Sequence, residues 1–142
     1  MIVTMYKSST KIKVRYAETD KMGIVYHSNY YIYFEVARED LISYAGMKYK
    51  ALEDYGVMMP IMETHCKYHE GARYGDELDI ETYIEELTPF KAVIGYKVMR
   101  ESDNKLIAQG KTVQAFVDSQ SFRIINLKKV HPDIWEKLNV LV

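Results

Sequence analysis

The chain has 142 residues and a formal net charge of −1, from 19 basic and 20 acidic residues. This length fits one domain, residues 1–142, and the 48% of residues that are hydrophobic can fill its core. The charges form no block of like sign, so neither a nucleic-acid tract nor a polybasic membrane patch is indicated. No apolar segment reaches the ~20 residues that span a bilayer. The single cysteine, Cys66, excludes an internal disulfide, and we expect a cytoplasmic protein without membrane insertion.

The first predicted elements are a strand and a long helix. Polar and apolar side chains alternate over residues 10–16, which predicts a half-buried strand whose inner face carries Ile12, Val14 and Tyr16. From Asn29 to Ala45 the apolar residues recur with helical spacing. Ser28 or Asn29 is suited to cap the start of this helix, and Gly46 is suited to end it.

After the long helix the pattern changes to strands. A short helical pattern over 49–55 ends at Gly56, and Pro60 introduces the alternating segments. These segments predict strands at 61–70, 77–86, 90–101 and 105–118, with a further short strand at 122–125. Pro132 fits the first turn of a closing helix. We therefore predict an α+β fold, an antiparallel sheet of five or so strands packed on one long helix.

A sheet of this kind has two faces and two edges, and one helix covers only one face. The uncovered surface favours association with a second copy, for which a dimer has the simplest symmetry.

The stretch from Thr19 to Tyr30 carries the strongest chemical signal. Asp20 lies on a loop that leads into the long helix, and a carboxylate there can act as a base or as a nucleophile. The start of the helix supplies free backbone N–H groups and a partial positive charge. On chemistry alone, Asp20 is equally a turn former or a helix-capping acid.

Other candidate groups are weaker. His65 and His69 lie on a predicted strand, where four residues span ~13 Å, so they cannot share one metal ion. Cys66 lies in the middle of the same strand and is predicted to be a buried, unreactive thiol. The sequence has no glycine-rich phosphate loop, and we predict no metal site.

The run Tyr-Ala-Glu-Thr-Asp-Lys-Met-Gly-Ile-Val-Tyr-His-Ser-Asn-Tyr-Tyr, residues 16–31, resembles the signature of the 4-hydroxybenzoyl-CoA thioesterase family. Members of this family are hotdog-fold acyl-CoA thioesterases. The chain is most similar to the small bacterial branch associated with the Tol–Pal envelope system. Gly71–Asp76 resembles the family's second landmark, and the order of elements agrees over roughly residues 10–127.

The resemblance implies a hotdog, a curved antiparallel sheet wrapped around the helix at 29–45. It implies a dimer with a continuous sheet, often paired again into a tetramer, with active sites at the dimer interface. Asp20 matches the family's catalytic acid, and the backbone N–H of His27 would polarise the thioester carbonyl. The implied reaction is hydrolysis of an acyl-CoA to a carboxylic acid and CoA. It needs no cofactor and no metal, because CoA is part of the substrate and its thiolate is a good leaving group.

The substrate-binding residues are assigned by their place in this scheme. Basic side chains near the mouth of the pocket would bind the CoA phosphates, and the candidates are Arg73, Lys91 and Arg123. The acyl pocket or its entrance would be shaped by Tyr26, Asn29 and Tyr30.

Several alternatives stay open at this point. Some hotdog thioesterases use a glutamate on the central helix, and Glu35 and Glu39 are the candidates here. Two other functions are hydration or dehydration of a β-hydroxyacyl thioester and non-catalytic binding of acyl-CoA or an acyl-carrier protein. The sequence does not separate CoA from carrier-protein substrates, fix the acyl chain, or choose between a general-base and a mixed-anhydride route.

Overall fold

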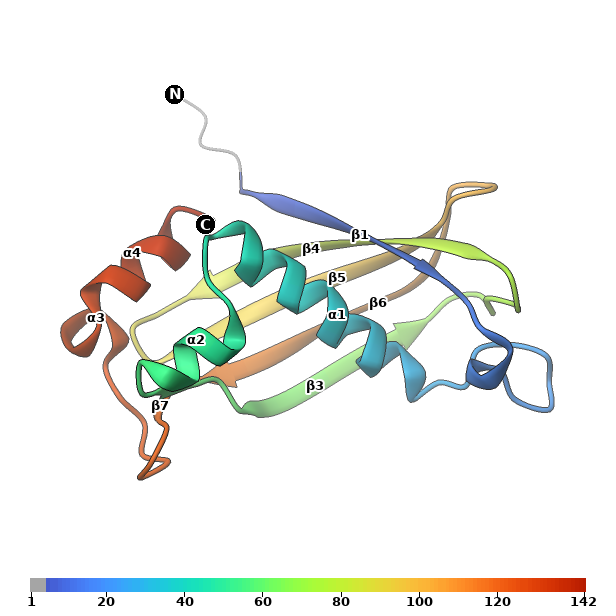
Figure 1. The fold of residues 1–142 in the computed structure, drawn as a ribbon. Coiled ribbons are helices and arrows are strands. Elements are labelled where there is room, and N and C mark those ends of the chain that lie inside the picture. The colour runs from blue at the N-terminus through green and yellow to red at the C-terminus, as the bar shows by residue number, and fades with distance from the viewer. Residues whose placement is uncertain (1–4) are drawn as a thin grey trace.

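The structure is a computed structural model that describes residues 5–142, so residues 1–4 of the predicted domain lie outside the described residues. A five-stranded antiparallel sheet lies against one long helix, α1 (Asn29–Tyr44), as the α+β prediction required (Figure 1). In spatial order the strands are β1 (Lys7–Lys13), β4 (Glu77–Leu87), β5 (Lys91–Arg100), β6 (Lys105–Ala115) and β3 (Ile61–Tyr68).

The remaining elements are short. A second, two-stranded sheet pairs β2 (Val57–Met58) with β7 (Val117–Asp118), and a 3-10 helix, η1 (Tyr16–Glu18), follows β1. Three further helices are α2 (Tyr49–Asp54), α3 (Leu127–Val130) and α4 (Pro132–Asn139). Both α3 and α4 lie at the end of the sheet opposite the loop that leads into α1 (Figure 1).

The core lies between α1 and the sheet because the strands alternate as their sequences predict. Phe34 of α1 is fully buried and stacks on Tyr96 of β5, with ring centroids 4.2 Å apart. Gly110 of β6 permits this approach, since a Cβ at that position would lie 2.9 Å from the Phe34 ring. The helix therefore packs closely over the middle of the sheet and fixes where its N-terminus lies.

The predicted end of α1 is confirmed. Gly46 has φ of +84°, a conformation in which a side chain would be strained, and its N–H donates to the carbonyl of Ser43. The N–H of Met47 donates to the carbonyl of Ile42, which completes a Schellman motif.

Two local predictions are wrong. The first strand runs over Lys7–Lys13 rather than 10–16, and Tyr16 is 76% exposed instead of facing the core. The chain leaves the sheet early because the Glu18 carboxylate accepts a hydrogen bond from the Arg15 backbone N–H, 2.8 Å, which tightens residues 16–18 into η1. At 122–125 there is a single bridge, between Val117 and Ile124, rather than a strand.

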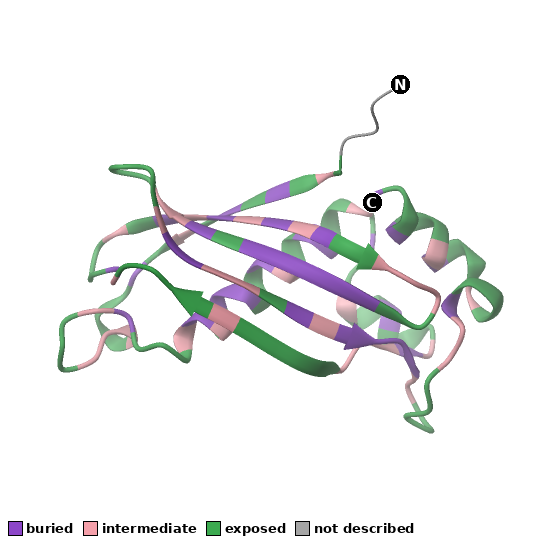
Figure 2. Ribbon diagram, turned by 180° about the vertical axis from the view of Figure 1, so that it is seen from behind, coloured by how far each residue is buried: buried purple, intermediate pink, exposed green. Residues whose placement is uncertain are grey.

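The edge strand β3 differs from every other strand of the main sheet. It pairs only with β6, and seven of its eight residues are exposed, with Cys66 half-buried (Figure 2). Such an edge presents a row of unpaired backbone groups to an incoming strand. Among residues 5–142, the helices are too short or too polar to cross a membrane.

Candidate active site

Asp20 lies on a tight turn that its own carboxylate helps to hold. The N–H of Gly23 donates to the Asp20 carbonyl, and the N–H of Asp20 donates to the carbonyl of Ile24, both at 2.9 Å. The Met22 N–H donates to Oδ1 of Asp20 at 2.9 Å, the pattern of an Asx turn. Gly23 has φ of +80°, which the turn requires. Among the described residues, no group donates to Oδ2, so that oxygen is open to a substrate or a water.

The carboxylate lines a cavity of about 280 Å³. Three segments far apart in the sequence form its walls: the loop before α1, the first turn of α1, and the chain that follows β3. The lining residues are Asp20, Met22, Ile24, Val25, His27, Tyr30, Tyr68, His69, Glu70 and Gly71.

The start of α1 is open toward this cavity. Ser28 occupies the N-cap position, as predicted, but its side chain makes no hydrogen bond to the helix. Within residues 5–142, the backbone N–H groups of His27 and Ser28 donate no hydrogen bond. The helix start thus keeps free donors and its positive end of the dipole beside Asp20.

Glu18 ties the loop to the helix, a role that the sequence analysis missed. Its carboxylate accepts hydrogen bonds from the Arg15 N–H at 2.8 Å and the Tyr33 hydroxyl at 3.0 Å, and it pairs with the Arg15 guanidinium. Its carbonyl accepts from the Asn29 side chain at 2.8 Å and from the Tyr26 N–H at 2.9 Å. Burial raises the pKa of Glu18, but the hydrogen bonds from Arg15 and Tyr33 outweigh it and leave the pKa lowered.

Two of the residues that line the cavity, Val25 and Tyr30, are buried. The N–H of Val25 donates to the carbonyl of Ala72 at 2.8 Å, which joins the loop before α1 to the chain after β3. Tyr30 is only 3% exposed, and burial raises its pKa to about 12, so its phenol is neutral at physiological pH. The hydroxyl of Tyr68, at the end of β3, donates to the carbonyl of His27 at 3.3 Å.

The predicted residues near Asp20 fall into two groups. His27 and Tyr30 line the cavity with it. Arg73, Tyr26 and Asn29 are near but do not line it. Arg73 lies beside the Asp20 turn, because a Cβ on Gly23 would be 3.5 Å from its guanidinium. Tyr26 is exposed beside the His27 ring, and the Asn29 side chain donates to the Glu18 carbonyl.

The other predicted residues lie elsewhere in the chain. Lys91 begins β5 and Arg123 follows β7, both near the end of the sheet that carries α3 and α4 (Figure 1). Glu35 and Glu39 are exposed on α1, and Glu39 lines a different cavity, of about 460 Å³. One chain therefore does not bring Lys91, Arg123, Glu35 or Glu39 to Asp20.

The wall formed by Tyr68, His69 and Glu70 was not predicted from the sequence. Only the neighbouring Gly71–Asp76 motif signalled this segment, because the pairing of β3 with β6 brings it to the loop and that pairing is not a local property. Cys66, half-buried on β3, has a thiol whose pKa is raised by burial. Within residues 5–142, no three His, Cys, Asp or Glu side chains are grouped so as to hold a metal ion.

Comparison with known proteins gives a consistent result. A family model described as the Thioesterase-like superfamily matches residues 14–138. The Bacillus subtilis protein YneP, provisionally named an acyl-CoA thioesterase, is 38% identical over 129 residues, which cover 91% of this chain and 93% of YneP. The acyl-CoA thioester hydrolase YbgC of Escherichia coli O6:H1 is 26% identical over 107 residues, covering 75% and 79%. The crystal structure of a DHNA-CoA thioesterase from Staphylococcus aureus superposes with a TM-score of 0.89 at 34% identity, covering 94% and 89%.

Proposed function

Because the chain belongs to the Thioesterase-like superfamily, we propose that it hydrolyses acyl-CoA thioesters to a carboxylic acid and CoA. The resemblance of residues 16–31 to hotdog thioesterases is confirmed by that membership and by the shared fold. The observation that carries the proposed chemistry is local: an open carboxylate oxygen of Asp20 and free N–H groups at the start of α1 border one cavity.

In this proposal the two groups act on different atoms of the thioester. The carbonyl oxygen gains negative charge as the carbonyl carbon is attacked, and the backbone N–H of His27 stabilises that charge. One such oriented donor typically lowers the barrier by ~3–4 kcal/mol. The partial positive charge of the helix start acts in the same direction. The imidazole of His27 has no part in this step.

Asp20 supplies the attack by one of two routes. It takes a proton from a water that adds to the carbonyl carbon, or its own oxygen adds and forms a mixed anhydride that water then opens. In both routes the carbon–sulfur bond breaks and the CoA thiolate leaves and takes up a proton. Neither route uses a cofactor, and both require the same carboxylate.

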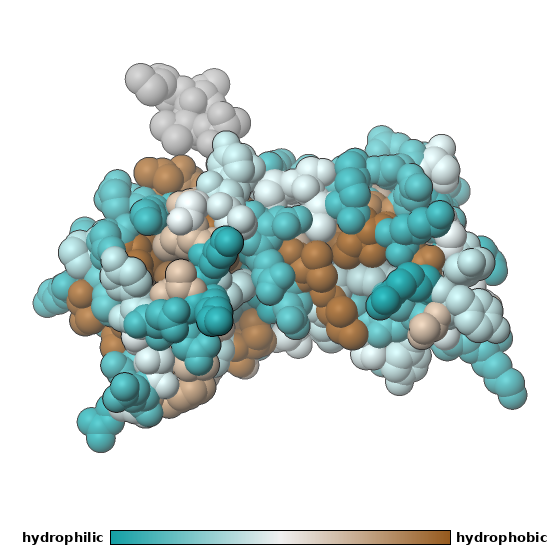
Figure 3. Space-filling model, viewed as in Figure 1, coloured by the Kyte–Doolittle hydropathy of each residue, from teal (hydrophilic) through white to brown (hydrophobic). Residues whose placement is uncertain are grey.

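We propose that the active unit is a homodimer formed through β3. The strand is an exposed edge, and apolar side chains continue from it onto α1: Met62 is 60% exposed, Ile32 55% and Val36 41%. Apolar surface interrupts the polar covering over the middle of α1 (Figure 3). A second copy of β3 would satisfy the free backbone groups and cover these side chains. Pairing of two such dimers into a tetramer is the further step that the family resemblance implies.

Such a dimer also extends the cavity. Antiparallel pairing of β3 with its own copy puts the end that carries Tyr68 beside the start of the partner's strand. Residues remote from Asp20 in one chain, such as Lys91 and Arg123, then reach the site only from the partner. Arg73 binds the CoA phosphates from beside the Asp20 turn of the same chain.

For the acyl group we propose a flat aromatic ring. The rings of Tyr30 and Tyr68 lie 5.5 Å apart, and His27 and Tyr68 are 6.2 Å apart, so aromatic groups form much of the cavity wall. The Staphylococcus aureus relative is described as acting on DHNA-CoA. Acyl-CoA thioesters occur in the cytoplasm, which is the compartment we propose; an acyl-carrier protein is the alternative thioester donor.

The test is a panel of hydroxyaryl-CoA, short-chain and long-chain acyl-CoA, and acyl-carrier-protein thioesters, with free thiol measured over time. We expect thiol release, fastest with the hydroxyaryl-CoA. Preference for an aliphatic substrate would contradict the acyl assignment but not the reaction. Binding of the panel without thiol release would contradict the reaction and favour a binding module.

A further inference from the structure

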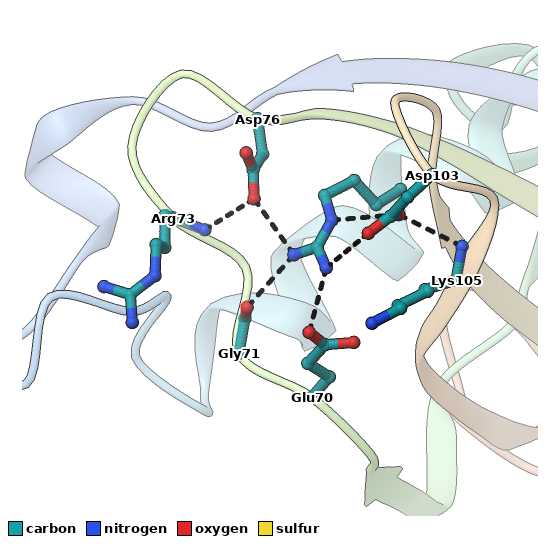
Figure 4. Close-up of polar contacts among 7 residues, drawn as sticks. Glu70, Gly71, Arg73, Asp76, Asp103 and Lys105 are labelled. Carbon is teal, nitrogen blue, oxygen red and sulfur yellow. Dashed lines mark hydrogen bonds and ion pairs between the residues drawn. The ribbon is translucent and has the colours of Figure 1, made fainter.

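Arg100, the last residue of β5, joins four groups around one guanidinium (Figure 4). Two nitrogens donate to the Asp103 carboxylate, at 3.1 and 2.9 Å, in a bidentate pair. One of them also donates to Glu70 at 2.9 Å. The third nitrogen donates to Asp76 and to the carbonyl of Gly71, both at 3.4 Å. The Arg100 side chain is 12% exposed, whereas the side chains of Glu70 and Asp103 are 41% and 37% exposed, so the cluster is partly open to solvent.

Two of these partners belong to the cavity wall. Glu70 and Gly71 both line the cavity that contains Asp20. Gly71 packs closely against the loop that carries Asp20, residues 17–28, called the reactive loop below: a Cβ on Gly71 would lie 2.5 Å from the side chain of Ile24. The next residue, Ala72, accepts the hydrogen bond from Val25. Any shift of this segment is therefore passed directly to the turn that presents Asp20.

The pairing of Glu70 with Arg100 affects the charge in the cavity that contains Asp20. The titratable or charged groups that line the cavity or lie beside the Asp20 turn are His27, Tyr30, Tyr68, His69, Glu70 and Arg73, and Lys21 is the exposed neighbour in the chain. Among the described residues, Glu70 is the only carboxylate that shares this cavity with Asp20. A second, unpaired negative charge there repels other negative charge in the cavity and opposes the charge that develops on a thioester oxygen.

We propose that Arg100 is a positioning residue for the active site: it clamps the Glu70–Gly71 wall against the reactive loop and keeps the Glu70 carboxylate paired and away from Asp20. This inference rests on the proposed thioesterase function. Arginine suits the task because its planar fork donates to several acceptors at once, which a lysine ammonium does not reproduce in the same geometry.

The experiment is a double-mutant cycle between R100M and E70Q, read as the pH dependence of kcat/KM. The acid limb of that profile reports the ionisation of the free enzyme's essential base. We expect R100M to move the limb upward by about half a pH unit or more. We also expect kcat to fall roughly tenfold, because the loop is no longer held in place, with a smaller change in KM. In the E70Q background, R100M should move the limb little.

The matched control is K11M. Lys11 also pairs with two acidic groups on the same sheet, Asp79 and Glu101, but it does not line the Asp20 cavity. We expect K11M to leave the profile unchanged. An unmoved limb in R100M, or a shift of equal size with and without Glu70, would overturn the proposal. If R100M does not fold, R100K tests the clamp alone: it keeps the positive charge but loses the fork, so we expect a lower kcat with little movement of the limb.

A readout independent of activity separates this inference from the proposed function. Amide hydrogen exchange of residues 20–25 and 70–73 should become faster in R100M and not in K11M. Equal exchange in the two variants would overturn the clamp, whatever the enzyme hydrolyses. A wild type that releases no thiol from any thioester would contradict the proposed function and leave the exchange result standing.

Discussion

Asp20 and Asp118 occupy similar turns at opposite ends of the sheet, yet their surroundings differ. Asp118 uses Oδ1 to accept two backbone N–H groups, from Ser121 at 2.8 Å and Gln120 at 2.9 Å, and these hydrogen bonds lower its pKa. Asp20 accepts one, from Met22, and turns its other oxygen to a cavity beside free N–H groups. Each aspartate therefore holds its own turn through Oδ1, one in a structural position and one in a candidate catalytic position. The cavity and the adjoining free N–H groups distinguish Asp20 from Asp118.

The sharpest test of this difference is the pair D20N and D118N. We expect D20N to lower kcat by ~100-fold or more, the size of effect seen when a general base or nucleophile is removed, with substrate binding kept. D118N should leave kcat/KM within about twofold of wild type, as for a surface change outside the site. The measurement is thiol release at saturating and limiting substrate. An unchanged rate in D20N would contradict the assignment and favour Glu35 or Glu39.

The second prediction tests the proposal that Asp20 is active only in the dimer. V36E places a charge on the apolar surface beside β3, and V130E places the same charge at a somewhat more exposed valine on α3. We expect V36E to give a monomer by size-exclusion chromatography and to lower kcat/KM by roughly tenfold or more. V130E should change neither quantity. A fully active V36E monomer would contradict the shared site.

The third prediction concerns the anchor of the loop. Glu18 has a lowered pKa in the folded chain, so it stabilises the fold above its unfolded pKa, and this contribution is lost as pH falls through the folded value. We expect E18Q to lower the melting temperature at pH 7 and to approach wild type only as the pH falls below the usual range of a carboxyl group. Activity should fall several-fold, since the loop loses its tie to Tyr33 and Arg15.

D118N provides the comparison for E18Q. The pKa of Asp118 is also lowered, so its removal should give the same sign of pH dependence, with a smaller loss because the residue is only half-buried. It should leave activity unchanged. If E18Q and D118N were alike in activity as well as in stability, Glu18 would be a turn residue without a role in the site.

The parts of the fold that could be predicted are those that depend on residues close together in the sequence. The bounds of α1 and its end at Gly46 depend on periodicity and one glycine, both local, and they were predictable. Tyr16 was misassigned because a single contact, between Arg15 and Glu18, ended the strand before the alternation did. The alternation of polar and apolar residues shows which face a side chain takes, but it does not show where the backbone leaves the neighbouring strand.

The candidate site was predictable only where its residues are adjacent in the sequence. Asp20, His27 and Tyr30 lie within one turn and the helix that follows, so a local pattern places them together. Glu70 and Arg100 reach the site through the β5–β6 and β3–β6 pairings, which link residues far apart in the chain. The distance of Lys91 and Arg123 from Asp20 could not be predicted for the same reason. The position of a residue along its own strand or loop does not reveal at which end of the sheet that residue lies.

The smallest expected effect is that of H27A. In the proposed reaction His27 contributes its backbone N–H, which alanine also supplies, so the loss of the ring should lower kcat by less than about tenfold. The ring does contact Tyr26 and Tyr68, with centroids 4.5 and 6.2 Å away, which accounts for a modest loss through the cavity wall. Thiol-release kinetics on H27A and D20N in parallel provide the measurement. A loss in H27A as large as that in D20N would mean that the imidazole takes part in proton transfer, which is the arrangement that the hydratase alternative requires.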